Sequence, residues 1–511
     1  MIPLLDRDAV RALDRDAVER LGLPSVVLME NAGKGATEVL LRRMGSSCDR
    51  PLVIGGPGQN GGDGWVVARQ LLVAGHRPRA VLVDAGATVS GDAAVNLSAL
   101  QALGVPVERG IDALHAALES CSLVVDALFG TGLDRPVGGE HAAAIDAIVR
   151  SGKPVFSLDV PSGVDATHGA VLGVAVRATV TATFGALKRG LFQHPAAALA
   201  GDVVLVPIGV PVPEHAEAWL LEPEDLARWV GPRPADAHKG SCGHVVVLGG
   251  PPGKSGAAVL AALGAMRAGA GLATVAVPSS SVPLVAAHTP ELMCRALGDD
   301  EPRDPAEAAS RILATCSDAS TVVLGPGFGT SATRAALSNE LALRLPMPTV
   351  LDADALTALA AMGIERLRAA AGPRVLTPHP GEAARLLGTM SAVVQADRYA
   401  SARAIAERSG QVCVLKGAGT LVTVPEPTGV RWLVCARGTP ALATAGSGDV
   451  LAGVIAALLC ALPAPEAASA GVLLHALAGE KAARSDRGLL ASDIAHALPD
   501  VWSAARHGSL R

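Results

Sequence analysis

The sequence predicts an α/β protein with mostly parallel sheets that helices cover on both faces. Two observations carry this prediction. Short apolar runs alternate with alanine-rich helical stretches along most of the 511 residues. The apolar runs also lack polar–apolar alternation, as expected for parallel strands buried on both faces. The expected strands cover residues 51–55, 80–84, 123–127, 155–159, 244–249, 273–277, 321–325, 349–352, 375–377 and 412–416.

A chain of this length predicts two domains or more. Residues 210–239 contain five prolines and many charges, which is typical of a linker with one short helix at 223–229. We therefore expect a Rossmann-like three-layer α/β/α domain at 1–212, a linker at 213–222 and a second α/β domain at 223–511.

Composition narrows the class of protein. A net charge of −5 gives no basic footprint for nucleic acid and no polybasic surface for a membrane. Asp6, Arg7 and Asp8 interrupt any signal sequence, and the longest apolar run, 450–462, is too short to span a bilayer. The eight cysteines are scattered and suit reduced thiols. We expect a cytoplasmic protein with small-molecule partners that forms a homo-oligomer, because exposed sheet edges are often covered by a second copy.

A glycine-rich segment follows the first expected strand. Gly56, Gly58 and Gly61 match the dinucleotide fingerprint Gly-x-Gly-x-x-Gly, and a helix is expected at 65–74. Glycines allow close approach of an anion, and the helix amino terminus attracts it. Asn60 and Asp63 are more than such a fingerprint needs, and they fall where open sheets bind ligands.

Two later strands end in an aspartate beside a glycine-containing loop, at Asp126 and Asp159. Together with Asn60 and Ser162, these residues would place several hard oxygen ligands close together. Such ligands suit an alkali or alkaline-earth cation better than zinc. For any single aspartate helix capping is the favoured explanation, whereas the set favours a site.

Residues 1–210, including the segment 29–33, resemble the NAD(P)H-hydrate epimerase family. The resemblance implies interconversion of the R and S forms of hydrated NADH or NADPH. It assigns potassium to Asn60, Asp126 and Ser162, and it makes Asp159 the candidate acid or base. The family usually has Asn where Gln59 stands. Implied substrate contacts are Gln59, Asn60, Gly61, Gly62, Asp63, Gly130, Thr131, Gly132, Leu133, Asp134, Arg135, Pro136 and Asp159. Lys188 is either a phosphate ligand or an exposed lysine at a strand end.

The strongest motif of the second half is Gly446-Ser447-Gly448-Asp449, directly before the apolar helix 450–462. A Gly-x-Gly loop at a helix start can hold a phosphate, and an aspartate there can take a proton from an attacking hydroxyl. The alternative is a capped buried helix. Residues 416–420, after the strand 412–415, suit a nucleotide but lack Walker A spacing. Together the two segments resemble a ribokinase-type nucleotide site.

Five further segments, 238–244, 256–258, 325–329, 352–356 and 377–382, resemble the ADP- or ATP-dependent NAD(P)H-hydrate dehydratase family over residues 222–500. The resemblance implies a ribokinase-like domain that phosphorylates the C6 hydroxyl of the hydrate and then expels phosphate. ADP is the expected donor and ATP the second choice, each with Mg²⁺. Asp449 is the implied base. Implied nucleotide contacts are Lys416, Gly417, Ala418, Gly419, Thr420 and Gly448, and implied hydrate contacts are Ala257, Gly327, His379 and Asp449.

Each of three residues near these motifs has two possible interpretations. Lys254 stands where relatives often carry tyrosine, so that a stacking ring is replaced by a cation that can meet a phosphate. Asp352 and Asp354 either hold Mg²⁺ through water or cap a helix.

The whole sequence therefore predicts a bifunctional enzyme that repairs hydrated NADH and NADPH. One alternative is a vitamin or sugar kinase joined to a dinucleotide-binding regulator. Another is a non-enzymatic N-terminal half that serves as a binding or scaffold module.

Overall fold

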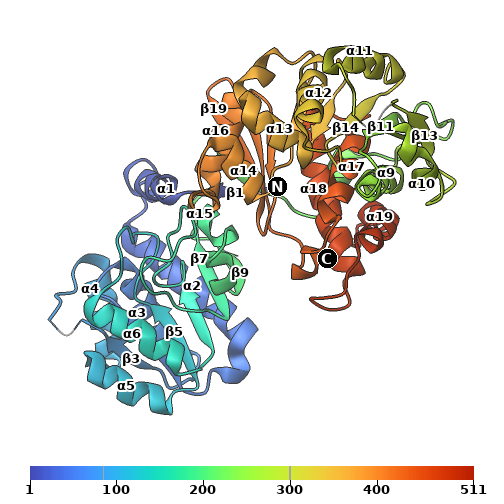
Figure 1. Ribbon diagram of the computed structural model, residues 1–511. Coiled ribbons are helices and arrows are strands. Elements are labelled where there is room, and N and C mark those ends of the chain that lie inside the picture. Colours follow the sequence, from blue (N-terminus) through green and yellow to red (C-terminus); the bar gives the residue numbers. More distant parts are fainter. Residues whose placement is uncertain (85, 214, 299–300, 511) are drawn as a thin grey trace. The chain divides into compact units, whose positions relative to one another are not determined.

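The computed structural model describes residues 1–84, 86–213, 215–298 and 301–510. The chain forms two compact units, Ile2–Ala218 and Trp219–Arg511, and Met1 belongs to the second. The division lies within segment 213–222, which includes strand β10 (Ala218–Leu220). Figure 1 shows helices around a sheet in each unit. The predicted fold class, α/β with mostly parallel sheets, is confirmed.

The N-terminal unit is built on a parallel seven-stranded sheet in the order β4-β3-β2-β5-β6-β7-β9. Because β2 lies between β3 and β5, the strand order reverses there, and open sheets bind ligands beyond the carboxyl ends at such a point. The strands are β2 (Pro51–Gly55), β3 (Arg79–Leu82), β4 (Val107–Arg109), β5 (Leu123–Ala127), β6 (Val155–Leu158), β7 (Val180–Phe184) and β9 (Asp202–Val206). Outside this sheet, β1 (Ile2–Leu5) pairs in parallel with β8 (Leu187–Lys188).

Helices cover both faces of this sheet. One apolar core joins α2, α3 and α4 to the sheet, and a second joins α5 and α6 to its other face (Figure 1). Aliphatic side chains build most of both cores, as the low aromatic content requires. The helices are α1 (Arg7–Glu19), α2 (Ser25–Met44), α3 (Gln59–Val73), α4 (Gly91–Ala102), α5 (Ile111–Ser120), α6 (Gly139–Arg150) and α7 (Ala196–Leu199).

Helix α3 begins at Gln59, so the prediction of a loop up to residue 64 is wrong. The physical reason is packing. A Cβ at Gly61 would lie 1.9 Å from the carbonyl oxygen of Gly56, and one at Gly62 would lie 2.7 Å from Sδ of Met29. These glycines are required because the first turn of α3 packs tightly on its neighbours, and this tertiary packing outweighs their low helix propensity.

In the C-terminal unit the strands follow the order β13-β12-β11-β14-β15-β16-β17-β18-β19-β10. The pairs from β13 to β17 are parallel, whereas β17, β18 and β19 are antiparallel. The bounds are β11 (His244–Leu248), β12 (Leu272–Val277), β13 (Met293–Ala296), β14 (Thr321–Leu324), β15 (Thr349–Leu351), β16 (Arg374–Leu376), β17 (Val412–Leu415), β18 (Thr420–Glu426) and β19 (Gly429–Cys435).

Helices α9, α17, α18 and α19 share one large apolar core with this sheet. Helices α11, α12, α13, α14 and α16 pack in succession as a second group (Figure 1). The helices are α8 (Asp225–Trp229), α9 (Ser255–Ala268), α10 (Val282–Ala286), α11 (Pro305–Thr315), α12 (Ala332–Arg344), α13 (Asp354–Met362), α14 (Pro380–Leu387), α15 (Ser391–Ala396), α16 (Arg398–Ser409), α17 (Ser447–Leu459), α18 (Ala464–Ala482) and α19 (Ala491–Arg506).

Several predicted strands end one residue earlier in the structure. Strands β6, β15 and β17 stop at a leucine, so that Asp159, Asp352 and Lys416 are the first residues beyond their strands. Each polar side chain thereby stands at the carboxyl edge of its parallel sheet, where ligands bind.

Candidate active sites

The N-terminal unit contains a cavity of about 840 Å³ at the carboxyl ends of β2, β5 and β6. Most of the predicted epimerase contacts line it, whereas Gly61 and Gly62 do not. The predicted contacts in its wall are Gln59, Asn60, Asp63, Gly130, Thr131, Gly132, Leu133, Asp134, Arg135, Pro136 and Asp159. The cavity therefore lies at the reversal of strand order, as the sheet topology requires.

Asp159 is held by three hydrogen-bonding groups. Its Oδ1 lies 2.6 Å from Nζ of Lys188, and its Oδ2 accepts hydrogen bonds from the backbone N–H, at 2.7 Å, and the hydroxyl of Thr131. The backbone of Asp159 has a φ of 67°, unusual for a residue with a side chain. Burial raises the pKa of Asp159, but the charge and hydrogen bond of Lys188 and the bonds from Thr131 outweigh it. The net pKa is lowered, so Asp159 is a carboxylate at neutral pH.

Lys188 is fully buried at the end of β8, so the interpretation as an exposed lysine is wrong. Its ammonium group also donates a 2.7 Å hydrogen bond to the carbonyl of Phe184. No spacing rule indicated this position, because its partner, Asp159, is contributed by a different strand end.

Two further carboxyl groups line the same cavity, Asp63 from α3 and Asp14 from α1. Burial raises the pKa of each, and the nearby charge of Asp159 raises it further, while Lys188 opposes the shift. Asp14 was not predicted from the sequence, because α1 carries no recognisable motif. Arg11 of α1 also reaches the cavity and donates a 3.3 Å hydrogen bond to the carbonyl of Gly132.

Asp126 and Ser162 form a buried network behind the cavity. Both oxygens of Asp126 accept hydrogen bonds, from the Ser162 hydroxyl at 2.6 Å and from the Ser157 hydroxyl and Ser162 N–H at 2.9 Å each. Burial raises the pKa of Asp126, while these bonds oppose the shift. Asn60 is also buried, and neither its amide oxygen nor its amide nitrogen has a hydrogen-bond partner in the described parts of the chain. An unpartnered buried amide indicates a ligand.

In the C-terminal unit, Gly446 begins the turn into α17 with a φ of 86°, and Asp449 lies in the first turn of that helix. Burial raises the pKa of Asp449 to about 7, and the charges of Asp352, Asp354 and Glu382 add to the shift, while Lys416 opposes it. Asp449 is therefore suited to accept a proton near neutral pH.

Lys416 connects the strand ends of this unit. Its Nζ lies 2.6 Å from Oδ1 of Asp352 and 3.9 Å from Oε2 of Glu382. The hydroxyl of Thr377 donates a 2.8 Å hydrogen bond to the same oxygen of Asp352. A Cβ at Gly448 would lie 3.3 Å from Nζ of Lys416, so this cation stands beside the amino end of α17. Asp352 is thus an ion-pair partner rather than a helix cap.

His379 caps α14. Its Nδ1 accepts a 3.0 Å hydrogen bond from the backbone N–H of Gly381, and the backbone N–H of His379 donates a 2.8 Å bond to Oε2 of Glu382. The imidazole is half exposed. Capping therefore fixes the ring at the edge of the sheet and leaves part of it available for contact.

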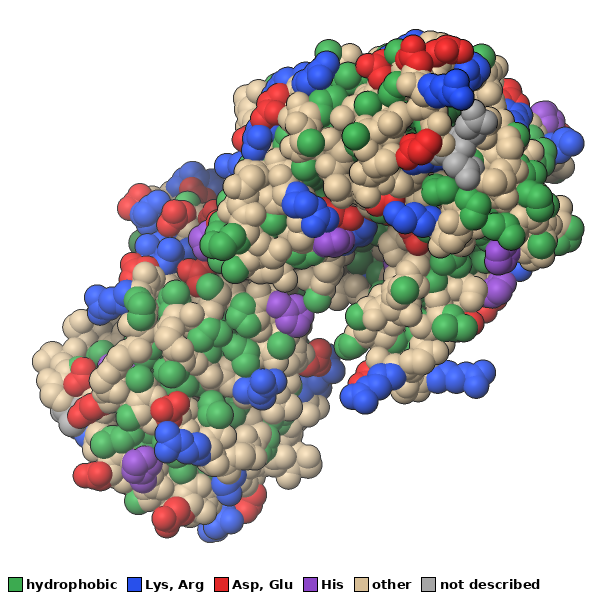
Figure 2. All heavy atoms as spheres, in the orientation of Figure 1, with side chains coloured by type: hydrophobic (Ala, Val, Ile, Leu, Met, Phe, Trp, Pro, Cys, Tyr) green, Lys and Arg blue, Asp and Glu red, His purple; other side chains and the backbone are tan. Residues whose placement is uncertain are grey.

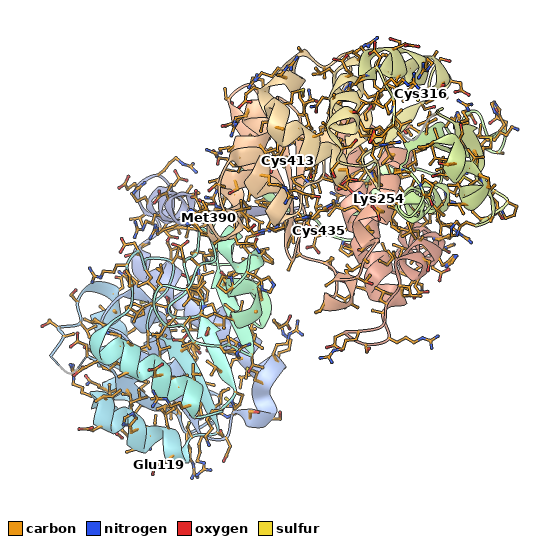
Figure 3. The ribbon with its side chains drawn as sticks, in the orientation of Figure 1. Glu119, Lys254, Cys316, Met390, Cys413 and Cys435 are labelled. Carbon is orange, nitrogen blue, oxygen red and sulfur yellow. The ribbon has the colours of Figure 1, made fainter. Side chains whose placement is uncertain are left out.

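Lys254 and Asp354 face each other at the starts of α9 and α13. Nζ of Lys254 lies 3.5 Å from Oδ2 of Asp354, which also accepts a 2.8 Å hydrogen bond from the N–H of Gly329. A Cβ at Gly327 would lie 2.3 Å from the carbonyl oxygen of Lys254, so the loops after β11 and β14 are in contact. Ala257 lies in the first turn of α9. Acidic, basic and histidine side chains gather on this part of the visible face in Figure 2, where Figure 3 labels Lys254.

The segment 416–420 connects β17 and β18 as an exposed turn with φ of 138° at Gly417 and 68° at Gly419. The buried guanidinium of Arg398 donates a 3.1 Å hydrogen bond to the carbonyl of Leu415 and supports this turn from within. Burial lowers the pKa of Arg398 to about 10. Arg398 was not predicted from the sequence, because helix α16 carries no motif that marks it.

Comparison with known proteins decides the family. The model of the family described as NAD(P)H-hydrate dehydratase matches residues 245–500, and the model described as YjeF-related protein N-terminus matches residues 25–190. The bifunctional NAD(P)H-hydrate repair enzyme of Moorella thermoacetica is 39% identical over 96% of this chain and 94% of its own. The chain belongs to the bifunctional NAD(P)H-hydrate repair enzyme family.

Two other relatives in this repair enzyme family have similar coverage. The enzyme of Coxiella burnetii is 38% identical over 97% of this chain and 98% of its own, and that of Escherichia coli is 35% identical over 97% and 93%. Among solved structures, a ribokinase-like superfamily protein from Enterococcus faecalis is 26% identical over 57% of this chain and 98% of its own, with a TM-score of 0.49.

Membership of the repair enzyme family confirms the predicted bifunctional enzyme, an epimerase joined to a dehydratase. Family membership favours this prediction over the two alternatives, which were a kinase joined to a dinucleotide-binding regulator and a non-enzymatic N-terminal scaffold. No helix in the described ranges is long and apolar enough to cross a membrane.

Proposed function

We propose that the C-terminal unit dehydrates the S hydrate with Asp449 as the base that activates the C6 hydroxyl. The observation that carries this assignment is the position of Asp449 in the first turn of α17, with a pKa of about 7 and Lys416 nearby. An aspartate that is ordinarily acidic would be a poor base, whereas this one can hold the proton it removes.

The reaction then has two balanced steps. Asp449 takes the hydroxyl proton as the C6 oxygen attacks the terminal phosphorus, and the bond from that phosphorus to the nucleotide breaks. The backbone N–H groups at residues 446–448 and the ammonium of Lys416 stabilise the developing charge. Phosphate next leaves from C6, a proton leaves C5, and the C5–C6 double bond of NADH or NADPH returns.

The donor is a nucleotide bound over residues 416–420 and Gly448. ADP is the proposed donor, with ATP as the second candidate. Mg²⁺ bound with the nucleotide would neutralise phosphate charge. Asp354 is the carboxylate better placed to hold it, because Lys254 lies 3.5 Å from Asp354 whereas Lys416 lies only 2.6 Å from Asp352. The hydrogen bond that the N–H of Gly329 donates to Asp354 holds that side chain in place. Ala257, Gly327 and His379 are the proposed contacts of the hydrate.

For the N-terminal unit we propose epimerisation at C6 with Asp159 as proton acceptor and donor. The C6–OH bond breaks as the lone pair of the ring nitrogen forms a double bond to C6, and the departing oxygen takes a proton from a neutral carboxyl group of the cavity and leaves as water. Asp63 is the candidate donor, because burial and the charge of Asp159 raise its pKa well above the ordinary value. Water then adds to the opposite face of C6 and gives a proton to the Asp159 carboxylate, and return of that proton to the donor carboxylate completes the cycle. Asp159 suits this base role, because Lys188 and Thr131 keep it ionised in the cavity.

Potassium in this unit would be held by Asn60, Asp126 and Ser162. The unpartnered buried amide of Asn60 and the buried oxygens of Asp126 and Ser162 fit a hard monovalent cation. When bound, the ion would supply fixed positive charge near the substrate.

The dehydratase proposal is tested with purified S hydrate of NADH, Mg²⁺ and either ADP or ATP, followed by the return of absorbance at the NADH wavelength. The unaltered chain should restore NADH with ADP. Asp449→Asn should slow the restoration by about 10²–10⁴-fold. Phosphorylation of an added alcohol without return of NADH, or an unchanged rate in Asp449→Asn, would overturn the proposal.

Location and assembly are further proposals. Five of the eight cysteines are buried free thiols, among them Cys413 and Cys435 on the sheet of the C-terminal unit (Figure 3). Burial raises the pKa of Cys435 to about 12, so this thiol is unreactive. These features fit a reducing cytoplasm. We also propose a homo-oligomer, which light scattering of the purified chain would reveal as a mass at a multiple of 51.3 kDa.

A further inference from the structure

The cavity of the N-terminal unit holds one buried cation among several carboxyl groups. Lys188 is the only lysine in the described wall, while Asp14, Asp63 and Asp159 all interact with it electrostatically. The other charged or titratable groups that line the cavity are Arg11, Asp92, Asp134, Arg135 and His141.

The ammonium group is committed to one carboxylate. It lies 2.6 Å from Oδ1 of Asp159, and the carbonyl of Phe184 accepts a second hydrogen bond at 2.7 Å. The side chain of Lys188 is 1% exposed and that of Asp159 is 13% exposed. Asp159 is therefore the member of the pair that solvent in the cavity can reach. Burial of such a pair contributes little net stability, because desolvation offsets the attraction. Stability alone therefore gives no reason to place a lysine here.

Lys188 and Thr131 together occupy most of the hydrogen-bond acceptor positions of the Asp159 carboxylate. A carboxylate has about four acceptor positions. Lys188 takes one on Oδ1, while the N–H and hydroxyl of Thr131 take two on Oδ2. One position is left for a ligand in the cavity. The φ of 67° at Asp159 directs the side chain toward these partners.

We propose that Lys188 is a positioning residue of the epimerase site, which fixes the Asp159 carboxylate so that a single acceptor position faces the C6 hydroxyl or the incoming water. This inference rests on the proposed role of Asp159. It adds a residue to which neither a motif nor the epimerase resemblance assigned a role in orienting the base.

The ion pair with Lys188 also distinguishes Asp159 from the two other carboxyl groups. Asp63 and Asp14 have no ion pair within 4.0 Å in the described ranges, whereas Asp159 does. The ion pair therefore lowers the pKa of Asp159, whereas burial and the charge of Asp159 raise the pKa of Asp14 and of Asp63.

The experiment uses the full chain and a hydrate sample enriched in the R epimer. Lys188→Met should lower kcat for conversion of R to S about 10²–10⁴-fold, the range of general acid–base effects, with KM changed less than threefold. Removal of the cation should also move the acid limb of the pH profile to higher pH, because Asp159 then keeps its proton longer. The dehydratase rate with pure S hydrate is measured in the same sample and should not change.

A double-mutant cycle distinguishes positioning from simple damage. Asp159→Asn should lose as much as Lys188→Met, and the double variant should lose no more than either alone. Lys153→Met, a lysine of the same unit outside the cavity, is the matched control and should retain the full rate. Lys188→Arg retains the charge and should recover part of kcat. If Lys188→Met fails to fold by circular dichroism, Lys188→Arg and the double variant still decide between these outcomes.

Different results overturn different claims. A normal kcat in Lys188→Met, or losses that add in the double variant, overturns the role of Lys188. A normal epimerisation rate in Asp159→Asn overturns the proposed function of Asp159 itself, whatever Lys188 does.

Discussion

Asp159 and Ala353 are the two non-glycine residues of the described ranges with a positive φ, at 67° and 47°. Such conformations cost on the order of 1–3 kcal/mol and persist where the surroundings enforce them. One lies in each candidate site. Ala353 separates Asp352, which faces Lys416, from Asp354, which accepts the N–H of Gly329. The unusual backbone thus directs two carboxylates that are two residues apart to different partners.

The pKa of Asp449 predicts the pH dependence of dehydration. As a base it must be ionised, and its raised pKa of about 7 means that it loses its proton only near neutrality. kcat/KM for the S hydrate should therefore rise with pH and level off above an apparent pKa of about 7. Stopped assays from pH 5 to 9 would show this limb. A rate that is flat down to pH 5 contradicts the assignment of Asp449.

Replacement of Lys416 tests the ion pair with Asp352. Lys416→Met leaves the buried Asp352 without its cation, and loss of one partner of a buried pair costs about 3–5 kcal/mol. We expect a lower midpoint of chemical denaturation and a higher KM for ADP. The double variant with Asp352→Asn should regain much of the stability but not the nucleotide affinity. Recovery of both would show that Lys416 does not contact the nucleotide.

Individual residues were predictable when a local motif marked them. Asn60, Asp126 and Asp449 stand beside glycine-rich turns, and the structure brings each to the carboxyl edge of its sheet. Lys188 was interpreted only as a phosphate ligand or an exposed lysine, and Arg398 was not singled out at all. Their roles depend on partners at other strand ends, which only the folded chain brings within reach.

Helices α9 and α17 contact each other through glycines. A Cβ at Gly453 would lie 1.8 Å from the carbonyl oxygen of Ala261, and one at Gly264 would lie 2.6 Å from that of Val450. Because Asp449 lies in the first turn of α17, this contact between the helices determines how deeply the proposed base is buried. Helix α18 adds to the support, since Nε2 of His475 lies 3.0 Å from the carbonyl oxygen of Ser447.

Gly453→Ala tests this helix contact. The added methyl group must push the helices apart, which should lower the free energy of unfolding by about 1–3 kcal/mol. Gly256→Ala, in α9 with open space around it, is the matched control and should be neutral or slightly stabilising. Calorimetry of the full chains measures both. Equal melting temperatures for the two variants would contradict the tight contact.

Strands and helices were predicted well where a run of apolar residues marked them. They were predicted less well where tertiary packing determines their bounds. The ten expected strands are found within one or two residues of their positions, whereas the parallel strands β4, β7, β9 and β13 were not predicted. The start of α3 was misplaced, because Gly61 and Gly62 disfavour a helix locally and only the contacts with Gly56 and Met29 explain it. The antiparallel pair β18 and β19 was not foreseen, because the apolar pattern at 420–435 carried no clear signal of its pairing.

At the scale of the whole molecule, each unit presents its site at the carboxyl edge of its own parallel sheet. The two sets of chemical groups differ in kind. The N-terminal set keeps a carboxylate ionised beside a lysine, whereas the C-terminal set raises the pKa of a carboxyl at a helix amino terminus. Separate proton chemistry in each unit suits one activity that interconverts epimers and another that consumes one of them.

The most direct test of the central claim is complementation between two full-length variants. R-enriched NADH hydrate is supplied with ADP and Mg²⁺, and NADH absorbance is followed. Asp449→Asn alone should restore almost no NADH. Asp159→Asn alone should restore it only as fast as the hydrate epimerises without catalysis. A mixture of the two variants should restore it at nearly the rate of the unaltered chain, because each supplies the activity that the other lacks. A mixture no faster than Asp159→Asn alone would contradict the assignment of the two activities to the two sites.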